Sequence, residues 1–219
     1  MTSYDIAVIG GTGPQGRGLA YRWAKHGHRV VLGSRSADRA TEAAAEITAR
    51  GTAGPVSGAS NADAAAGADV VVLAVPYDGH DDLVSSLAGQ LAGKTVISCV
   101  NPLGFDKQGP YALQVEEGSA TQQAAAILAD SRVVGAFHNV SAVLLEDPGV
   151  EQVDTDVLVL GDDREATTLV QELADAVPGM RGVYGGRLRN AHQVEALTAN
   201  LIAINRRYKC HAGLRVTDV

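Results

Sequence analysis

Glycines recur at short intervals near the start of the chain, in the run Gly11-Thr12-Gly13-Pro14-Gln15-Gly16. The run directly follows a predicted strand, Asp5 to Ile9, and opens a predicted helix, Gly16 to His26. There the first glycine permits a tight turn, the second lets backbone N–H groups approach a pyrophosphate, and the third allows close packing of helix on strand. The helix N-terminus adds free donors and a positive dipole end. We therefore predict a dinucleotide site; the alternative is a turn that binds no nucleotide.

The residues after the second predicted strand, Arg29 to Leu32, favour one form of that dinucleotide. Chains that bind NAD usually carry an acidic residue about 20 positions beyond the glycines, where it bonds the ribose 2′-hydroxyl. Here Ser34 and Arg35 stand at that place, and Arg39 follows one helical turn later. A guanidinium donates two parallel, charge-assisted hydrogen bonds to a phosphate. This predicts NADP(H) rather than NAD(H), unless both arginines are simply solvated surface charges.

The segments that leave the other predicted strands should form the substrate crevice, because ligands bind outside the carboxyl ends of such strands. Those segments are Val75-Pro76-Tyr77, Val100-Asn101-Pro102 and the stretch from His138 to Ala142. His138 is a candidate to contact the reacting groups, although a histidine at a strand end is as often a structural hydrogen-bonding group. Tyr77 and His80 are weaker candidates of the same kind.

A tyrosine and a lysine on the first predicted helix have the spacing of the acid–base pair of short-chain dehydrogenases. These residues, Tyr21 and Lys25, follow the glycine run directly and are far from any strand end. We therefore expect them to be surface residues without a catalytic role.

The elements that must position these residues alternate along the chain. Short β-branched runs are separated by alanine-rich helical stretches, which is typical of a parallel sheet with crossover helices. We predict an α/β fold of the Rossmann type, with a doubly wound, mostly parallel sheet and a small C-terminal helical part. Residues 101–118 are expected to be irregular, Asn61 to cap a short helix, and Ser119 with Gln122 to form a capping box. Further predicted strands are Asp69–Val75, Thr95–Val100, Arg132–Ala136 and Thr155–Leu160.

The last predicted helix, Asn190 to Lys209, has a narrow apolar seam and a basic character. The seam packs on another helix, either within the fold or across a dimer. Arginines and lysines outnumber acidic residues in this region, which would attract an anionic partner, although a solvated cationic helix end is an equal alternative. We predict an NADP-binding Rossmann domain over residues 1–185 and a C-terminal helix and tail over 186–219 that complete the substrate cleft. The seam consists of Val194, Leu197, Leu201, Ile204 and Tyr208.

Composition narrows the remaining possibilities. The chain has 219 residues, a formal net charge of −7 and 46% hydrophobic residues, so we expect a globular protein that does not bind nucleic acid. No apolar run approaches the roughly 20 residues that span a membrane, and we predict no signal peptide. Cys99 and Cys210 form no metal-binding pattern. We therefore expect a cytoplasmic protein without a metal site.

Stretches spread over the whole chain carry a more specific signal. They include several that have nothing to do with phosphate binding, and together they resemble the NADPH-dependent coenzyme F420 reductases, also called F420H2:NADP oxidoreductases. The matching stretches are Ile9–Gly13 with Gly16 and Gly18, Gly27-His28, Gly33-Ser34-Arg35, Val75-Pro76, Ala136-Phe137-His138, Gly161-Asp162-Asp163 and Glu195-Ala196-Leu197-Thr198.

The resemblance implies hydride transfer between the nicotinamide C4 of NADP(H) and C5 of the 5-deazaflavin coenzyme F420. It also implies a homodimer, and it places His138 and Val140 against the deazaflavin. A deazaflavin accepts a hydride without a dedicated protein acid, so positioning of two rings is the main task. Its tail is anionic, which gives Arg206 and Arg207 a possible role. The residues implied to contact NADP are Thr12, Gly13, Pro14, Gln15, Ser34, Arg35, Arg39, Val75 and Ala142, beside the motif glycines Gly11 and Gly16.

Three alternatives remain open at this point. An NADPH-dependent reductase of a small carbonyl or imine would need a tuned acid such as Tyr77, His80 or His138. A flavin or ferric reductase would share the fold and differ in the acceptor. A sensor that binds NADP(H) and a partner without turnover would need no acceptor.

Overall fold

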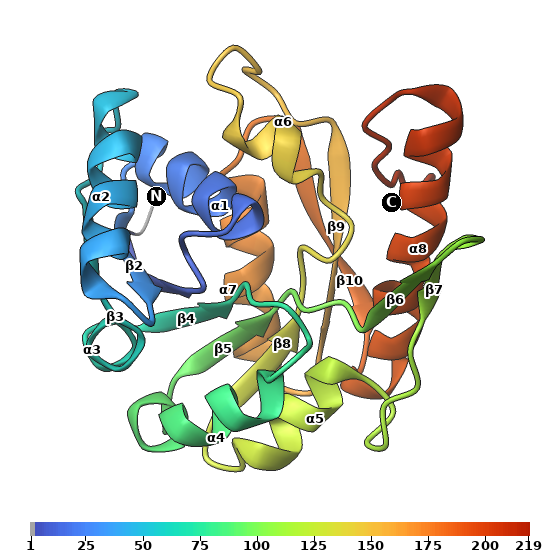
Figure 1. Ribbon diagram of the computed structural model, residues 1–219, viewed down its shortest axis with the longest axis horizontal. Helices are drawn as coiled ribbons and strands as arrows, with labels where there is room; N and C mark the ends of the chain where they lie inside the picture. The colour runs from blue at the N-terminus through green and yellow to red at the C-terminus, as the bar shows by residue number, and fades with distance from the viewer. Residues whose placement is uncertain (1–2) are drawn as a thin grey trace.

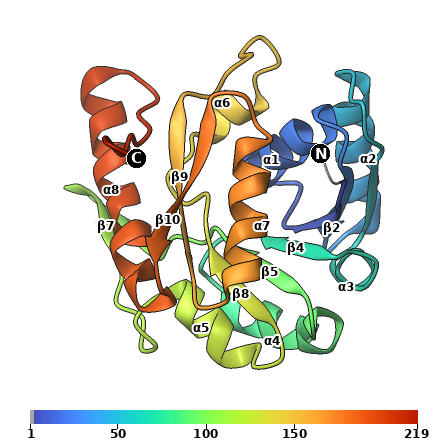
Figure 2. The ribbon, with the colours of Figure 1, turned by 180° about the vertical axis from the view of Figure 1, so that it is seen from behind.

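The computed structural model describes residues 3–219 and forms one layered α/β arrangement, with an eight-stranded sheet covered by helices on both faces (Figures 1 and 2). The elements in chain order are β1 (Asp5–Ile9), α1 (Pro14–Lys25), β2 (Arg29–Ser34), α2 (Ala37–Ala49), β3 (Val56–Ser60), α3 (Asn61–Ala66), β4 (Val70–Leu73), α4 (His80–Leu91), β5 (Thr95–Ser98), β6 (Leu103–Asp106), β7 (Gly109–Ala112), α5 (Ala120–Ile127), β8 (Arg132–Gly135), α6 (Ala142–Glu146), β9 (Thr155–Gly161), α7 (Arg164–Asp175), β10 (Met180–Gly186), the 3-10 turn η1 (Leu188–Asn190) and α8 (Ala191–Tyr208).

Alternation along the strands divides the core into two layers, because successive strand residues point to opposite faces of a sheet. In β1, Ile6 and Val8 pack beneath α1, α2, α6 and α7, whereas Ala7 and Ile9 pack beneath α3, α4 and α5. In β4, Val70 and Val72 likewise join the first layer. Strands that are buried on both faces must be apolar throughout, which is why these runs are continuous rather than alternating.

The strand order is β10-β9-β8-β5-β4-β1-β2-β3, and every neighbouring pair is parallel except β8 with β9. The chain winds outward from β1 through β2 to β3 and then returns to place β4 on the other side of β1. The change of direction between β1 and β4 is the switch point at which open α/β sheets bind ligands. The predicted Rossmann fold is therefore confirmed.

Residues 101–118, which we expected to be irregular, contain a β-hairpin. Strands β6 and β7 pair antiparallel outside the main sheet, and Asp106 closes the turn because its Oδ1 accepts bonds from the N–H groups of Gln108 and Gly109. Glycine at 109 suits a turn with φ of +123°. Strand β10 was also missed, since its three glycines interrupt any apolar run.

Three local expectations need correction. Helix α1 begins at Pro14 rather than Gly16, because proline fits the first helical position, where no N–H partner is needed. Ser60, not Asn61, caps α3, with its hydroxyl accepting from the N–H of Asp63. Tyr21 is not a surface residue: it is 1% exposed, and the Lys25 ammonium lies 5.6 Å from the centre of its ring.

Helix α8 stands beside the hairpin at one end of the molecule (Figure 1). Its seam is only half covered: Val194 and Leu201 are buried, whereas Ile204 is 39% and Tyr208 is 72% exposed. The tail after α8 returns to β9, where Arg215 joins Arg181 in binding the buried carboxylate of Asp156. The hydrogen bond from Arg181 lowers the pKa of that carboxyl.

Candidate functional site

The glycine loop connects β1 to α1 at the switch point of the sheet. The N–H of Gly11 donates to the carbonyls of Val8 and Gly33, at 3.1 and 3.0 Å, and the N–H of Gly13 donates to the carbonyl of Gly10 at 3.0 Å. The bond to Gly33 ties the loop to the end of β2. The glycine run and the end of β2 are therefore neighbours in space, although Gly11 and Gly33 are 22 positions apart in sequence.

Two of the three motif glycines are required by packing within the protein, and the third is not. A Cβ atom on Gly11 would lie 2.7 Å from the carbonyl oxygen of Val8, and one on Gly16 would lie 2.8 Å from the Cα of Gly11. A Cβ on Gly13 would meet only the carbonyl oxygen of Gly10, at 3.4 Å. The open side of Gly13 fits the approach of a pyrophosphate to the backbone at the N-terminus of α1.

The predicted 2′-phosphate residues lie at the end of β2. Ser34 is buried and its hydroxyl accepts from the N–H of Ser36, while Arg35 and Arg39 are exposed. Within residues 3–219 neither guanidinium has an ion pair or a side-chain hydrogen bond. Both are thus free to bind an anion beside the glycine loop.

A cavity of about 320 Å³ opens beside the glycine loop, at the ends of β4, β5 and β8. It brings together four of the predicted cofactor residues, Gly13, Pro14, Gln15 and Val75, with His138 and with residues that were not predicted as site residues. Gln15 also donates through Nε2 to the carbonyl of Phe137, 3.1 Å away, and so joins the loop to the segment after β8. The cavity is lined by Gly13, Pro14, Gln15, Ala74, Val75, Pro76, Cys99, Asn101 and His138.

A second cavity of about 720 Å³ adjoins the first, because Pro76 and Asn101 line both. Its walls come from the loop after β4, the hairpin β6–β7, helix α5 and helix α8. Leu103, Phe105, Leu113 and Ile202 make much of the wall apolar, as a planar ring system would require. The remaining lining residues are Tyr77, Asp78, Gly79, Asp81, Gln123 and Thr198.

His138 lies at the junction, but its imidazole does not face the cavity. The side chain is 0% exposed, so His138 reaches the cavity surface through its main chain. Burial lowers the pKa of the imidazole to about 3, so the ring is neutral at physiological pH. The ring thus lies behind the cavity wall in this structure, and its contact with the reacting groups stays a prediction.

Two further predicted residues lie outside the walls of both cavities. Val140 is 8% exposed and belongs to the hydrophobic core. Ala142 is the first residue of α6, which packs on α1. Contact of Val140 with a deazaflavin and of Ala142 with NADP stays a prediction.

A polar network, which the sequence patterns do not mark, joins the strand ends to α8. Asn101 and Thr198 both donate to the carbonyl of His138, at 3.1 Å each, and the amide of Asn139 donates to the hydroxyl of Thr198 at 2.8 Å. The position of Asn101 directly after a buried strand was the available signal. Nothing in the periodicity of α8 marks Thr198, because its partners are distant in sequence.

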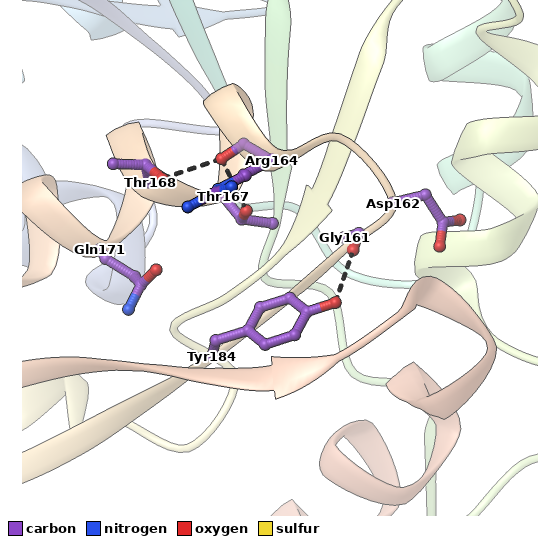
Figure 3. A pocket seen from close by; sticks show the side chains of 7 residues that line it. All are labelled: Gly161, Asp162, Arg164, Thr167, Thr168, Gln171 and Tyr184. Atoms are coloured by element: carbon purple, nitrogen blue, oxygen red, sulfur yellow. Dashed lines mark hydrogen bonds between the residues drawn. The ribbon is translucent and has the colours of Figure 1, made fainter. Parts of the chain in front are cut away.

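A third cavity, of about 400 Å³, lies between α7 and β10 (Figure 3). Its polar groups bond locally: the hydroxyl of Tyr184 donates to the carbonyl of Gly161 at 3.5 Å, and Thr167 and Thr168 both donate to the carbonyl of Arg164. Because β9 runs antiparallel to β8, this cavity lies at the sheet edge opposite the glycine loop. It is separate from the candidate site.

Residues 3–219 contain no cluster of three or more histidine, cysteine or acidic residues that could hold a metal ion. No helix in that range combines the length and the hydropathy that crossing a membrane requires.

The fold, the glycine loop and the two adjoining cavities define a Rossmann-type oxidoreductase with room for a dinucleotide and a second substrate. Comparison with known proteins narrows this class. The family model for "NADP oxidoreductase coenzyme F420-dependent" matches residues 5–102. The F420-dependent NADP reductase of Methanothermobacter thermautotrophicus is 41% identical over 222 residues, covering 98% of this chain and 95% of the relative.

The reductase of the same name from Methanocaldococcus jannaschii is 38% identical and covers 98% of both chains. A solved structure from Arthrobacter sp. fb24, described as an F420-dependent NADP reductase, superposes with a TM-score of 0.81 at 27% identity and covers 98% of this chain and 100% of that one. The chain belongs to the family of F420-dependent NADP reductases.

Proposed function

We propose that this protein transfers a hydride between NADP(H) and the deazaflavin coenzyme F420. The observation that carries the proposal is the contact of the two cavities through Pro76 and Asn101. One cavity begins at the glycine loop, and the other has an apolar wall that suits a planar ring. Two rings bound on either side of this junction would meet without intervening water. The full-length relatives of the same family support this pair of substrates.

The proposed NADP site extends from the end of β2 to the junction. The backbone of the glycine loop and the N-terminus of α1 hold the pyrophosphate, while Ser34, Arg35 and Arg39 bind the 2′-phosphate. The nicotinamide lies against Val75, next to the junction. The motif residues in this site are Gly11, Thr12, Gly13, Pro14, Gln15 and Gly16, with Ala142 at the start of α6 as a further contact.

NADPH supplies a hydride at its nicotinamide, and the deazaflavin takes it up within its own ring system. The chain contributes position and exclusion of water rather than acid–base chemistry. The titratable groups at the first cavity fit that role, because burial raises the pKa of the Cys99 thiol to about 12 and lowers that of His138 to about 3. Neither group changes its charge near neutral pH.

The C-terminal part completes the second cavity in this proposal. Thr198 and Ile202 of α8 line it, which supports a role of residues 186–219 in the substrate cleft. We also propose a homodimer, in which the exposed half of the α8 seam and the exposed Phe105 of the hairpin are covered by a second copy. Two free cysteines agree with a cytoplasmic location.

A direct assay tests the proposal. Purified protein is mixed with NADPH and oxidised coenzyme F420, and the visible absorbance of the deazaflavin is followed; parallel reactions contain NADH or a common flavin. We expect fast bleaching with NADPH, much slower bleaching with NADH, and none with the flavin. Intact NADPH binding without bleaching in either direction would overturn the deazaflavin assignment and leave a carbonyl reductase or a sensor.

A further inference from the structure

Helix α8 contacts His138 from two sides, and one of these contacts has no part in the function proposed above. Thr198 binds the carbonyl of His138, as described. Glu195, three residues earlier on α8, places its Oε1 3.9 Å from His138 Nε2, and the side chains of both residues are almost completely buried, at 3% and 0% exposed. Burying a carboxyl next to a buried imidazole costs free energy of folding unless hydrogen bonds or a partner charge offset the loss of water.

The carboxyl of Glu195 is held firmly by the N-terminus of α5. Its Oε2 accepts from the N–H of Ala120 at 2.9 Å, and its Oε1 accepts from the N–H and the hydroxyl of Thr121 at 3.0 and 2.7 Å. All three neighbours are donors, so the carboxyl acts as an acceptor here. Its orientation is therefore set by α5 and does not depend on His138.

The imidazole of His138 has no hydrogen bond of its own. Neither Nδ1 nor Nε2 has a partner within residues 3–219, although both atoms are inaccessible to solvent. The ring is nevertheless tightly enclosed, since a Cβ atom on Gly135 would lie 3.2 Å from both its Cε1 and the hydroxyl oxygen of Thr121. Packing therefore encloses the ring, and the carboxyl of Glu195 is the acidic group within 4 Å of a ring nitrogen in the described part of the chain.

We infer that Glu195 is a positioning residue, which holds His138 in the tautomer with the proton on Nε2 and thereby fixes the main chain that walls the junction of the two cavities. An N–H dipole at Nε2 points its positive end at the carboxyl, whereas a lone pair there would be repelled by it. The inference rests on the proposed function only for its effect on rate.

The tautomer can be measured without any substrate. Long-range proton–nitrogen correlation spectra of the 15N-labelled protein report which ring nitrogen of each of the six histidines is protonated, and His138→Asn identifies the signal of interest. We expect the proton on Nε2 of His138 in the wild type. A proton on Nδ1 would overturn the inference directly, even if no variant folds.

Two variants separate charge from helix capping. In Glu195→Gln the negative charge next to Nε2 is lost, while the amide oxygen at the Oε1 position can still accept from the N–H and the hydroxyl of Thr121. We therefore expect His138 to lose its preference for the Nε2–H tautomer and to show the Nδ1–H form. In Thr121→Val the carboxyl keeps its charge and both backbone donors, so the tautomer should not change. An unchanged tautomer in Glu195→Gln, accompanied only by lower thermal stability, would reduce Glu195 to a helix cap.

Kinetics supply the second readout. We expect Glu195→Gln to lower kcat by about 10-fold or more and to leave KM for NADPH within about 2-fold, because a small displacement at the junction affects ring alignment more than phosphate binding. The control is Glu165→Gln, whose side chain is 88% exposed, and it should match the wild type. If His138 carries its proton on Nε2 but the protein does not reduce F420, the role of Glu195 is upheld and the proposed function is overturned.

Discussion

At the scale of single residues, we expect the choice of NADP(H) to depend on arginine side chains that have no partner within residues 3–219. The guanidinium of Arg35 is exposed beside the glycine loop and forms no ion pair in the described part of the chain. We expect Arg35→Ala to raise KM for NADPH by about 10- to 100-fold and to leave that for NADH nearly unchanged, because charge-assisted bonds to the 2′-phosphate are lost. Steady-state kinetics with both nucleotides measure this.

The control for that experiment is Arg132→Ala. Arg132 begins β8 at the opposite edge of the sheet, and its guanidinium pairs with the exposed Glu165. It should leave both KM values unchanged. Equal losses with NADPH and NADH in Arg35→Ala would mean that Arg35 does not read the 2′-phosphate.

The buried imidazole of His138 predicts a pH dependence of stability. Its folded pKa of about 3 lies below the ordinary value of 6.5, so between these values the unfolded chain binds a proton that the folded chain excludes. The free energy of unfolding should therefore fall as pH falls through this window, by up to about 1.4 kcal/mol per pH unit. Above pH 6.5 the contribution is constant.

Urea unfolding of wild type and His138→Asn at pH 7.5 and 4.5 tests this expectation. Acidification should destabilise His138→Asn by roughly 2 kcal/mol less than the wild type. Burial also lowers the pKa values of His28 and His80, and these contribute equally to both proteins. Identical acid sensitivity of the two proteins would contradict a neutral, buried His138.

At the scale of elements, the contact of α1 with β1 depends on the absence of one methyl group. A Cβ on Gly16 would lie 2.8 Å from the Cα of Gly11, and backbone cannot move aside as a flexible side chain can. We expect Gly16→Ala to destabilise the fold by about 1–3 kcal/mol and to weaken NADPH binding. Thermal unfolding and a binding titration measure the two effects.

Gly89→Ala is the matched substitution on another helix. Gly89 lies within α4, and nothing is within 4 Å of the position of its Cβ. This change should stabilise the protein by about 0.5–1 kcal/mol. A loss of stability in both variants alike would argue against the specific contact between α1 and β1.

Helix α8 presents one row of residues to the second cavity, since positions four apart share a face of a helix. Thr198 and Ile202 line the cavity, and Arg206 continues the row to the hairpin turn, where its Nη1 lies 3.8 Å from the Cβ position of Gly109. We expect Arg206→Ala to raise KM for the deazaflavin by about 5- to 10-fold through loss of one contact with the anionic tail. KM for NADPH should stay unchanged.

Arg207 is the adjacent control, because it is exposed on a different face of α8. The two arginines are equivalent in the sequence, whereas the structure places only Arg206 in the row that continues from Thr198 and Ile202. If Arg206→Ala and Arg207→Ala change the deazaflavin KM equally, the basic region attracts the anionic tail by long-range electrostatics, and Arg206 makes no specific contact with it.

At the scale of the whole molecule, apolar side chains remain exposed on α8 and the hairpin. On the hairpin, Phe105 is 61% and Tyr111 is 47% exposed. On α8, Tyr208 is 72% exposed and Ile204 is exposed as well. We expect a dimer of the 22.6 kDa chain in sedimentation experiments, and Ile204→Asp should shift it to monomer because a charge in an apolar interface is costly. A monomeric wild type would refute the proposed homodimer.

The sequence by itself determined the elements whose signals are local. The glycine run between a strand and a helix, the β-branched runs and the arginine after β2 are each fixed by neighbours along the chain. They were enough to predict the Rossmann fold and a dinucleotide site after the first strand, whereas the family resemblance came from stretches spread over the whole chain. The missed elements include β10 and the hairpin β6–β7, whose glycines weaken any periodic pattern, so their pairing partners decide them.

Only the tertiary structure decided how the site is assembled from distant segments. It buried the imidazole of His138 behind the cavity wall, next to Glu195 of α8. It also joined two cavities through Asn101 and placed Thr198 and Arg206 along the second. Such contacts join residues 37 to 97 positions apart, and no local pattern records them. The chain's periodicity specifies which faces are buried, whereas packing of those faces specifies which polar groups meet.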